Sequence, residues 1–221
     1  MTQMETGRAL TIGALALQGD FREHLIAMER LGARAREVRL PRDLEGLDGL
    51  IIPGGESTVM GKLMVAYDLD QPLRDLIAGG TPVWGTCAGL ILLARETDNA
   101  LAGQPLLAAM DIRVWRNAFG AQRESFETDI SVPALGEEPY RAVFIRGPIV
   151  ESVGPDVEVL AQLAPGLSRA PGANIVAVRQ GSLLGTAFHP EITGDLRFHA
   201  YFLNMARSAT AQFTGASAAR A

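Results

Sequence analysis

The only cysteine of this chain lies in a turn whose residues are typical of a nucleophile. Cys87 is the centre of Gly85-Thr86-Cys87-Ala88-Gly89, between a short apolar run and the helical pattern of residues 90–94. The two glycines let the arms of a strand-to-helix turn approach closely and hold the sulfur above the sheet. The following helix directs its N–H groups and its positive dipole end at the sulfur, which favours the thiolate. The alternative is a buried, inert cysteine, but such a residue does not need paired glycines.

A cysteine nucleophile also needs a base, because a thiol of ordinary pKa is mostly protonated at neutral pH. Of the three histidines, His24 is expected on the surface of the first helix and His199 in a partly packed structural role in the last. His189 instead ends an apolar run, and a proline stops the chain directly after it. Glu191 can reach back to the other ring nitrogen, as the acid of a triad does. The pattern therefore predicts Cys87, His189 and Glu191 as catalytic; a surface His-Pro turn is the alternative.

Acyl transfer to a thiol further requires N–H donors for the oxyanion that develops on the substrate. The N–H of Ala88, next after the nucleophile, is the expected first donor. The second is expected from Gly55 in the turn Pro53-Gly54-Gly55-Glu56, since no side chain shields it. A plain turn and helix cap is the other interpretation of this segment.

The elements that must position these residues alternate between strand and helix in the first half of the chain. Apolar patterning predicts strands at 10–17, 33–40 and 47–52 and one leading into Cys87, with helices at 21–31, 56–65 and from 72. Short strands follow at 112–115, 127–132, 141–145, 157–162, 175–180 and 183–188, the last two joined by a hairpin at Gly181-Ser182, before a helix at 195–206. The predicted fold is α/β: an open, mostly parallel sheet with helices on both faces and an antiparallel extension in the second half. Three suspected site turns, Gln18-Gly19, Pro53-Gly54-Gly55-Glu56 and the Cys87 turn, lie at the carboxyl ends of strands, where such sheets bind ligands.

Composition narrows the class of protein. The 221 residues carry a net charge of −5, which argues against nucleic-acid binding. No signal peptide and no span of the roughly 18 apolar residues that cross a bilayer are evident, so we expect a cytoplasmic protein. We expect a single domain at 1–207 and a weakly ordered tail at 208–221. Four arginines, Arg34, Arg36, Arg39 and Arg42, indicate a solvated edge strand; a docking surface is the minor alternative.

With these motifs the chain resembles the class I glutamine amidotransferases, a Cys-His-Glu family with a flavodoxin-like fold. The finer resemblance is to the PdxT family, the glutaminase subunits of pyridoxal 5′-phosphate synthase. Segments 54–58 (Gly-Gly-Glu-Ser-Thr) and 144–146 (Phe-Ile-Arg) distinguish it from other glutaminases of the class. The further matching segments are 12–19, 22–24, 49–53, 85–94, 116–120, 125–127, 147–148 and 188–191. Ala118 and Gly147 depart from the family pattern, and residues 163–174 and the tail are longer than usual.

The resemblance implies roles for particular residues. Cys87 would be the nucleophile, His189 the base and acid, and Glu191 the residue that orients it. Contacts to L-glutamine are implied for Gly55, Glu56, Ser57, Arg116, Ile145 and Arg146. An arginine suits the substrate carboxylate and a glutamate its ammonium, but sequence does not say which arginine meets which group.

The resemblance also implies a partner. Ammonia would pass through a tunnel to a synthase (lyase) subunit in a hetero-oligomeric complex, with no metal or cofactor in the glutaminase itself. Gln18, at the end of the first strand, is a candidate relay between docking and the oxyanion loop. Two alternatives stay open: a glutaminase for another acceptor, such as in the imidazole glycerol phosphate or chorismate pathways, and a glutaminase-like regulatory module without turnover.

Overall fold

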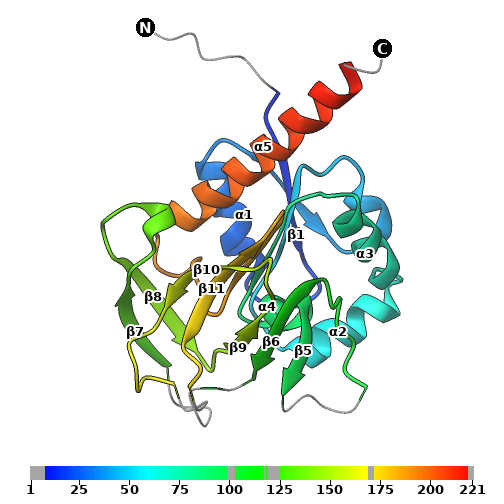
Figure 1. Cartoon of the computed structure of the whole chain (residues 1–221). Coiled ribbons are helices and arrows are strands. Elements are labelled where there is room, and N and C mark those ends of the chain that lie inside the picture. The colour runs from blue at the N-terminus through cyan, green and yellow to red at the C-terminus, as the bar shows by residue number, and fades with distance from the viewer. Residues whose placement is uncertain (1–7, 99–102, 117, 119–124, 169–171, 219–221) are drawn as a thin grey trace, which may run out of the picture.

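The computed structural model describes residues 8–98, 103–116, 118, 125–168 and 172–218. Within these residues ten strands form one sheet in the order β2-β1-β3-β4-β12-β11-β9-β6-β5, with β10 paired to β11. Two more strands, β7 and β8, form a separate antiparallel pair. Helices lie on both faces of the large sheet (Figure 1).

The first half of the chain builds the parallel part of the sheet, as predicted. Its strands are β1 (Thr11–Leu15), β2 (Arg34–Val38), β3 (Gly49–Ile52) and β4 (Val83–Thr86), all in parallel pairing. Helices α1 (Phe21–Arg30), α2 (Ser57–Ala66), α3 (Asp70–Ala78) and α4 (Ala88–Leu93) follow β1, β3 and β4. Strands β1, β3 and β4 are buried along their length, because helices cover both faces of a sheet of this kind.

The second half extends the sheet with largely antiparallel pairs. Its strands are β5 (Ala94–Asp98), β6 (Met110–Trp115), β7 (Ser125–Ile130), β8 (Tyr140–Ile145), β9 (Ile149–Val153), β10 (Glu158–Gln162), β11 (Ile175–Gln180) and β12 (Leu183–Thr186). The predicted hairpin between β11 and β12 is confirmed. Strands β5 and β9 were not predicted; β5 is charged and directly follows a helix, so no alternating pattern marks it. Strand β12 pairs in parallel with β4 and thereby completes the parallel half.

The last helix, α5 (Arg197–Ala218), is longer than the predicted 195–206. Alanines continue the segment after residue 206, and alanine has the highest helix propensity. Thr210 on this extension hydrogen-bonds to the carbonyl of Ala206 (3.0 Å) and to Asp48 (3.4 Å). The division into a domain at 1–207 and a tail at 208–221 stays a prediction.

The central strands β4 and β12 present opposite kinds of residue to the two faces of the sheet. On one side are glycines: a Cβ on Gly85 would lie 2.5 Å from the backbone of Gly89, and one on Gly185 would lie 2.5 Å from Leu90, so α4 packs directly on the sheet here. On the other side Trp84 packs against Phe198 and Phe202 of α5. Helices α1 and α5 contact each other on that side.

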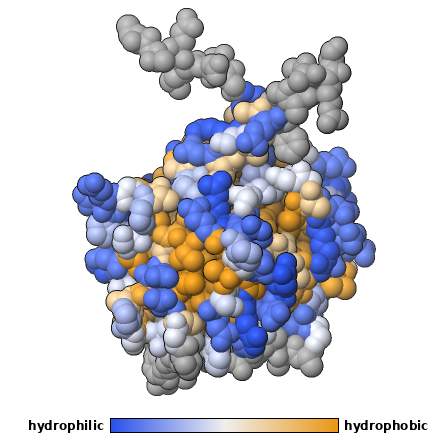
Figure 2. Space-filling model, in the orientation of Figure 1, coloured by the Kyte–Doolittle hydropathy of each residue, from blue (hydrophilic) through white to orange (hydrophobic). Residues whose placement is uncertain are grey.

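The position of β2 at the edge of the large sheet agrees with the prediction from its arginines. Strand β2 is an edge strand, and Arg36 and Arg39 on and beside it bond to neighbouring carbonyls and to Glu37. Figure 2 shows apolar residues gathered across the middle of one face below α5, with hydrophilic residues around them. Among the described residues, no helix combines the length and the apolar character needed to span a membrane.

Candidate active site

Cys87 occupies the turn between β4 and α4 in a backbone conformation that residues with side chains rarely adopt. Its φ is 46° and its ψ is −100°, and its N–H donates to the carbonyl of Thr186 on β12 (2.8 Å). The flanking glycines are required: a Cβ on Gly89 would lie 2.0 Å from the carbonyl oxygen of Ile52. A non-glycine residue held at positive φ in a strand-to-helix turn is the geometry of a nucleophile elbow.

His189 reaches Cys87 because β12 is the parallel neighbour of β4. The two residues follow strands paired in register from Leu183 with Val83 to Thr186 with Thr86. Nδ1 of His189 lies 2.7 Å from Oε1 of Glu191, and its backbone N–H donates to the carbonyl of Val143 (2.9 Å). The imidazole is almost fully buried.

The surroundings of His189 favour its protonated form. Burial on its own lowers the pKa, but hydrogen bonds with Cys87 and Glu191 and the negative charges of both outweigh it. Together they raise the pKa of His189 to about 10. The arrangement can therefore hold His189 as an imidazolium next to Cys87 at neutral pH.

The expectation that His24 is a surface residue is wrong. His24 is fully buried between α1 and the sheet, with Nε2 3.3 Å from Oε2 of Glu191 and 3.3 Å from Oγ1 of Thr86. Its Nδ1 lies 3.0 Å from Nε2 of His199, which is likewise fully buried in α5. The helical pattern alone did not show that α5 covers this side of α1.

The loop that was predicted to hold the oxyanion lies against the triad. A Cβ on Gly54 would lie 2.5 Å from Cε1 of His189, so only glycine fits there. Gly55 has φ of +155°, and a Cβ on it would lie 2.6 Å from Oε1 of Gln18. Gln18 accepts a hydrogen bond from the N–H of Glu56 (2.7 Å), which ties the end of β1 to this loop.

One pocket of about 380 Å³ gathers nearly all of the predicted site residues. Only Glu191 lies behind it, in contact with His189. Sequence reasoning missed two lining residues: Asp20, whose carboxylate lies 3.8 Å from Nδ1 of His189, and Ile91, one turn along α4 from Cys87. The pocket is lined by Gln18, Asp20, Gly55, Glu56, Ser57, Cys87, Ala88, Ile91, Arg116, Ile145, Arg146 and His189.

Charged groups at the pocket wall are held by a small network. Glu56 caps α2 by accepting from the N–H groups of Thr58 (3.2 Å) and Val59 (2.7 Å). Arg116 lies 3.3 Å from Oε1 of Glu56 and donates to Gln104 (2.7 Å), which also donates to Ser57 (3.2 Å). Gln104 was not predicted, because it lies between elements and carries no motif. The network can recognise an amino acid with its ammonium and carboxylate.

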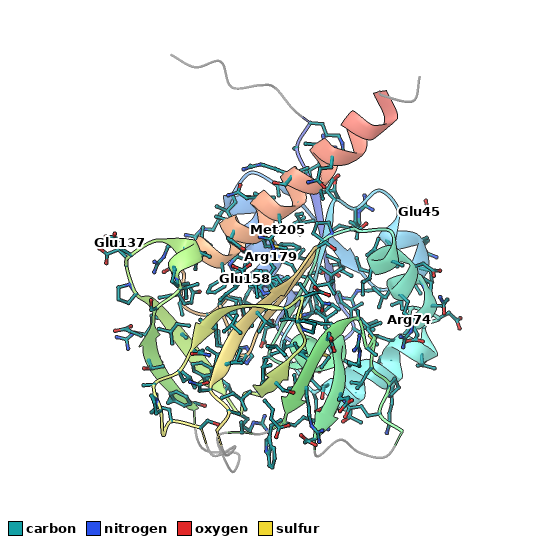
Figure 3. All side chains as sticks on the ribbon, in the orientation of Figure 1. Glu45, Arg74, Glu137, Glu158, Arg179 and Met205 are labelled. Atoms are coloured by element: carbon teal, nitrogen blue, oxygen red, sulfur yellow. The ribbon has the colours of Figure 1, made fainter. Side chains whose placement is uncertain are left out.

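Other groups in the described residues do not form a comparable site. Asp20, His189 and Glu191 are close enough to share a metal ion, but the last two already bond to each other. A larger hollow of about 640 Å³ lies between β11 and α5, lined in part by Arg179, Tyr201 and Met205. Figure 3 labels Arg179 and Met205 there. It contains none of the predicted catalytic or substrate residues.

Comparison with known proteins agrees with this geometry. A protein from Leifsonia xyli named pyridoxal 5′-phosphate synthase subunit PdxT is 59% identical over 87% of this chain and 93% of its own length. The protein of the same name from Moorella thermoacetica is 54% identical over 89% of this chain and 99% of its own. A crystal structure described as a glutamine amidotransferase superposes with a TM-score of 0.79 at 48% identity, over 88% of this chain and 98% of its own.

A more distant structure, PurLQS from Thermotoga maritima, superposes with a TM-score of 0.67 at 17% identity over 90% of this chain and 99% of its own, which supports the fold alone. The family model described as the SNO glutamine amidotransferase family matches residues 14–208. The predicted family and the predicted α/β fold class are confirmed: the chain belongs to the SNO glutamine amidotransferase family.

Proposed function

We propose that this chain hydrolyses L-glutamine to L-glutamate and ammonia as the glutaminase subunit of a pyridoxal 5′-phosphate synthase. The observation that carries the proposal is Cys87, held at positive φ in a strand-to-helix turn beside His189, which bonds to Glu191 (2.7 Å). Family membership supports the reaction, and the names of the relatives support the assembly.

In the first half of the reaction the Cys87 thiolate attacks the side-chain carbonyl carbon of glutamine. A carbon–sulfur bond forms, and the oxyanion is held by the N–H groups of Ala88 and Gly55. The His189 imidazolium gives its proton to the amide nitrogen, the carbon–nitrogen bond breaks, and ammonia leaves. The product is a γ-glutamyl thioester on Cys87.

In the second half neutral His189 takes a proton from water, and the hydroxide attacks the thioester. The carbon–sulfur bond breaks, glutamate leaves, and the thiolate–imidazolium pair is restored. Glu191 keeps the imidazole in one orientation and stabilises its charge at both stages. No metal or cofactor takes part in these steps.

The pocket wall would hold the amino-acid end of the substrate. Gly55, Glu56, Ser57, Arg116, Ile145 and Arg146 remain our proposed contacts. Arg116 is already paired with Glu56 and Gln104. Arg146 lines the same pocket without such a pair among the described residues, so Arg146 is available for the substrate carboxylate. Glu56 would then accept from the ammonium group.

Ammonia would be consumed by a synthase subunit docked to this chain. Gln18 holds the N–H of Glu56, so a partner that moves Gln18 would reposition the Gly54-Gly55 loop. If Gln18→Ala leaves synthase-stimulated glutaminase activity unchanged, this relay does not exist. We place the complex in the cytoplasm and the glutaminase domain at residues 1–207.

The test is to mix the chain with candidate synthase subunits and glutamine, and to measure glutamate and pyridoxal phosphate. Cys87→Ala should abolish both products from glutamine, while added ammonium salt still supports pyridoxal phosphate formation by the complex. Glutamine turnover with Cys87→Ala would overturn the proposal. Activity with only another acceptor synthase would reassign the partner and leave the glutaminase intact.

A further inference from the structure

Two histidines lie behind the triad, outside the pocket that we assign to glutamine. Oε2 of Glu191 makes no hydrogen bond with the described residues, and Nε2 of His24 lies 3.3 Å from it in a charge–dipole contact. Nδ1 of His24 lies 3.0 Å from Nε2 of His199. The side chains of Glu191 and His24 are fully buried, as is His199, so the line Glu191–His24–His199 lies inside the protein.

The charge of Glu191 selects one direction for the protons. A carboxylate beside Nε2 of His24 requires a proton on that nitrogen, because a lone pair there would face a negative charge. Nδ1 of His24 is then an acceptor, and Nε2–H of His199 donates to it. Nδ1 of His199 is left as a lone pair without a partner. The Nε2–H of His24 then faces Oγ1 of Thr86, with Oε2 of Glu191 at the same 3.3 Å from that nitrogen, so the N–H groups run from His199 toward Glu191.

Both rings are held neutral, so they act as hydrogen-bond donors and not as counter-ions. Burial, and then the nearby His199 and His189, keep the pKa of His24 well below its usual value. Burial lowers the pKa of His199 to about 4, against a smaller opposing effect of Asp195.

The rings are also fixed in place by packing. Trp84 of β4 meets His24 edge to face at 5.5 Å and His199 at 5.0 Å. Nε2 of His24 is also 3.3 Å from Oγ1 of Thr86, the residue before the nucleophile. His24 thus lies between the strand that ends at Cys87 and the acid of the triad.

We propose that His24 and His199 are positioning residues for the reaction: they hold Glu191 through its second carboxylate oxygen and so keep it aimed at His189. The inference rests on the proposed glutaminase function. The chain has three histidines, and the mechanism uses only His189. The inference gives a role to the other two, His24 and His199.

Several other ionisable groups face this line, and the test must hold them constant. Asp20 and Cys87 face His189, and Asp195 faces His199. Burial and the charges of Asp195 and Glu191 raise the pKa of Tyr140. Glu23 and Arg30 line a small cavity of about 130 Å³ together with Glu191 and His199. None of these residues is changed in the variants below.

The first arm of the test needs no activity. Nitrogen-15 NMR of the ring nitrogens, in protein labelled at histidine, reports tautomer and charge for all three histidines. We expect His24 and His199 to be neutral with the proton on Nε2, and His189 to be doubly protonated up to about pH 10. A proton on Nδ1 of His24, or a charged His24 at neutral pH, would overturn the proposal.

The second arm compares His24→Leu, which removes the donor, with His24→Gln, whose side-chain amide can place an N–H near the position of Nε2. Phe202→Leu is the matched control, because it loosens packing on Trp84 without touching the line. His24→Leu should lower kcat about tenfold or more at unchanged KM and should also lower the pKa of His189. His24→Gln should recover both, and Phe202→Leu should change neither.

The outcomes separate this inference from the proposed function. Equal loss in His24→Gln and His24→Leu, an unchanged pKa of His189 in His24→Leu, or the same effects in Phe202→Leu would overturn the positioning role. If His24→Leu does not fold, His199→Leu and His199→Gln provide the same comparison one residue further out. If the wild-type chain with its partner shows no glutaminase activity, the proposed function fails, while the NMR arm still decides whether the line exists.

Discussion

Replacing the nucleophile should change the proton affinity of the base by an amount that follows from the structure. The pKa of His189 is raised from 6.5 to about 10. In order of size, burial lowers it, whereas the hydrogen bond with Cys87, the hydrogen bond with Glu191, the charge of Cys87 and the charge of Glu191 raise it. Cys87 thus contributes both a hydrogen bond and a negative charge to this increase.

Cys87→Ala should therefore lower the pKa of His189 by roughly 1 to 3 pH units, the shift that an opposite charge at close range produces, equivalent to about 1.4 to 4 kcal/mol of interaction. The measurement is an NMR titration of the His189 ring nitrogens in the resting chain, assigned by comparison with His24 and His199. Cys87→Ser is the matched control: it keeps a small hydrogen-bonding group without the thiolate charge, and its His189 should titrate between wild type and Cys87→Ala. A His189 that still titrates near pH 10 in Cys87→Ala would refute the thiolate–imidazolium pair.

Three further changes test the surrounding site. Gly54→Ala places a Cβ 2.5 Å from Cε1 of His189 and should lower kcat/KM by roughly a hundredfold in steady-state assays, since it displaces the base; Gly79→Ala, at the end of α3, is the control that should have no effect. Glu56→Ala removes the cap of α2 and should raise KM for glutamine and lower the free energy of unfolding by about 1 kcal/mol. Burial raises the pKa of Glu56, but hydrogen bonds from Val59 and Thr58 outweigh burial and leave this pKa below its ordinary 4.5. Denaturant titrations of wild type and Glu56→Ala should therefore show the stabilisation by the cap in full above pH 4.5, and its loss as pH falls through the lowered pKa. A stability difference between the two proteins that is constant at all pH values would contradict the cap. Gly89→Ala forces a Cβ to 2.0 Å from the carbonyl of Ile52 and should destabilise the chain by about 3 kcal/mol or more in the same titrations, and near-wild-type stability would contradict the close packing at the elbow.

The central part of the site was predictable because its chemistry is encoded in local sequence. Cys87 between paired glycines and His189 before a proline both follow strands, and parallel strands bring their carboxyl ends to one edge. The pairing of β4 with β12, about a hundred residues apart, then joins the two residues. Local pattern and sheet topology were sufficient here.

Other parts of the site depend on tertiary contacts that no local pattern reveals. His24 has the helical spacing of a surface residue, but α5 packs over α1 and buries it. Gln104 and Asp20 carry no motif and enter the site only through the folding of loops around it. Strand β5, with its charged sequence, forms because β6 pairs with it.

The central claim is that Cys87 carries the glutamyl group during turnover. The direct measurement is mass spectrometry of the chain, quenched in acid while it turns over glutamine with its synthase partner. We predict a fraction of the chain heavier by one glutamyl group, with the addition on the peptide that contains Cys87, labile to hydroxylamine and absent from Cys87→Ala. Turnover of glutamine with no such adduct under conditions that trap thioesters, or an adduct on another residue, would contradict the account.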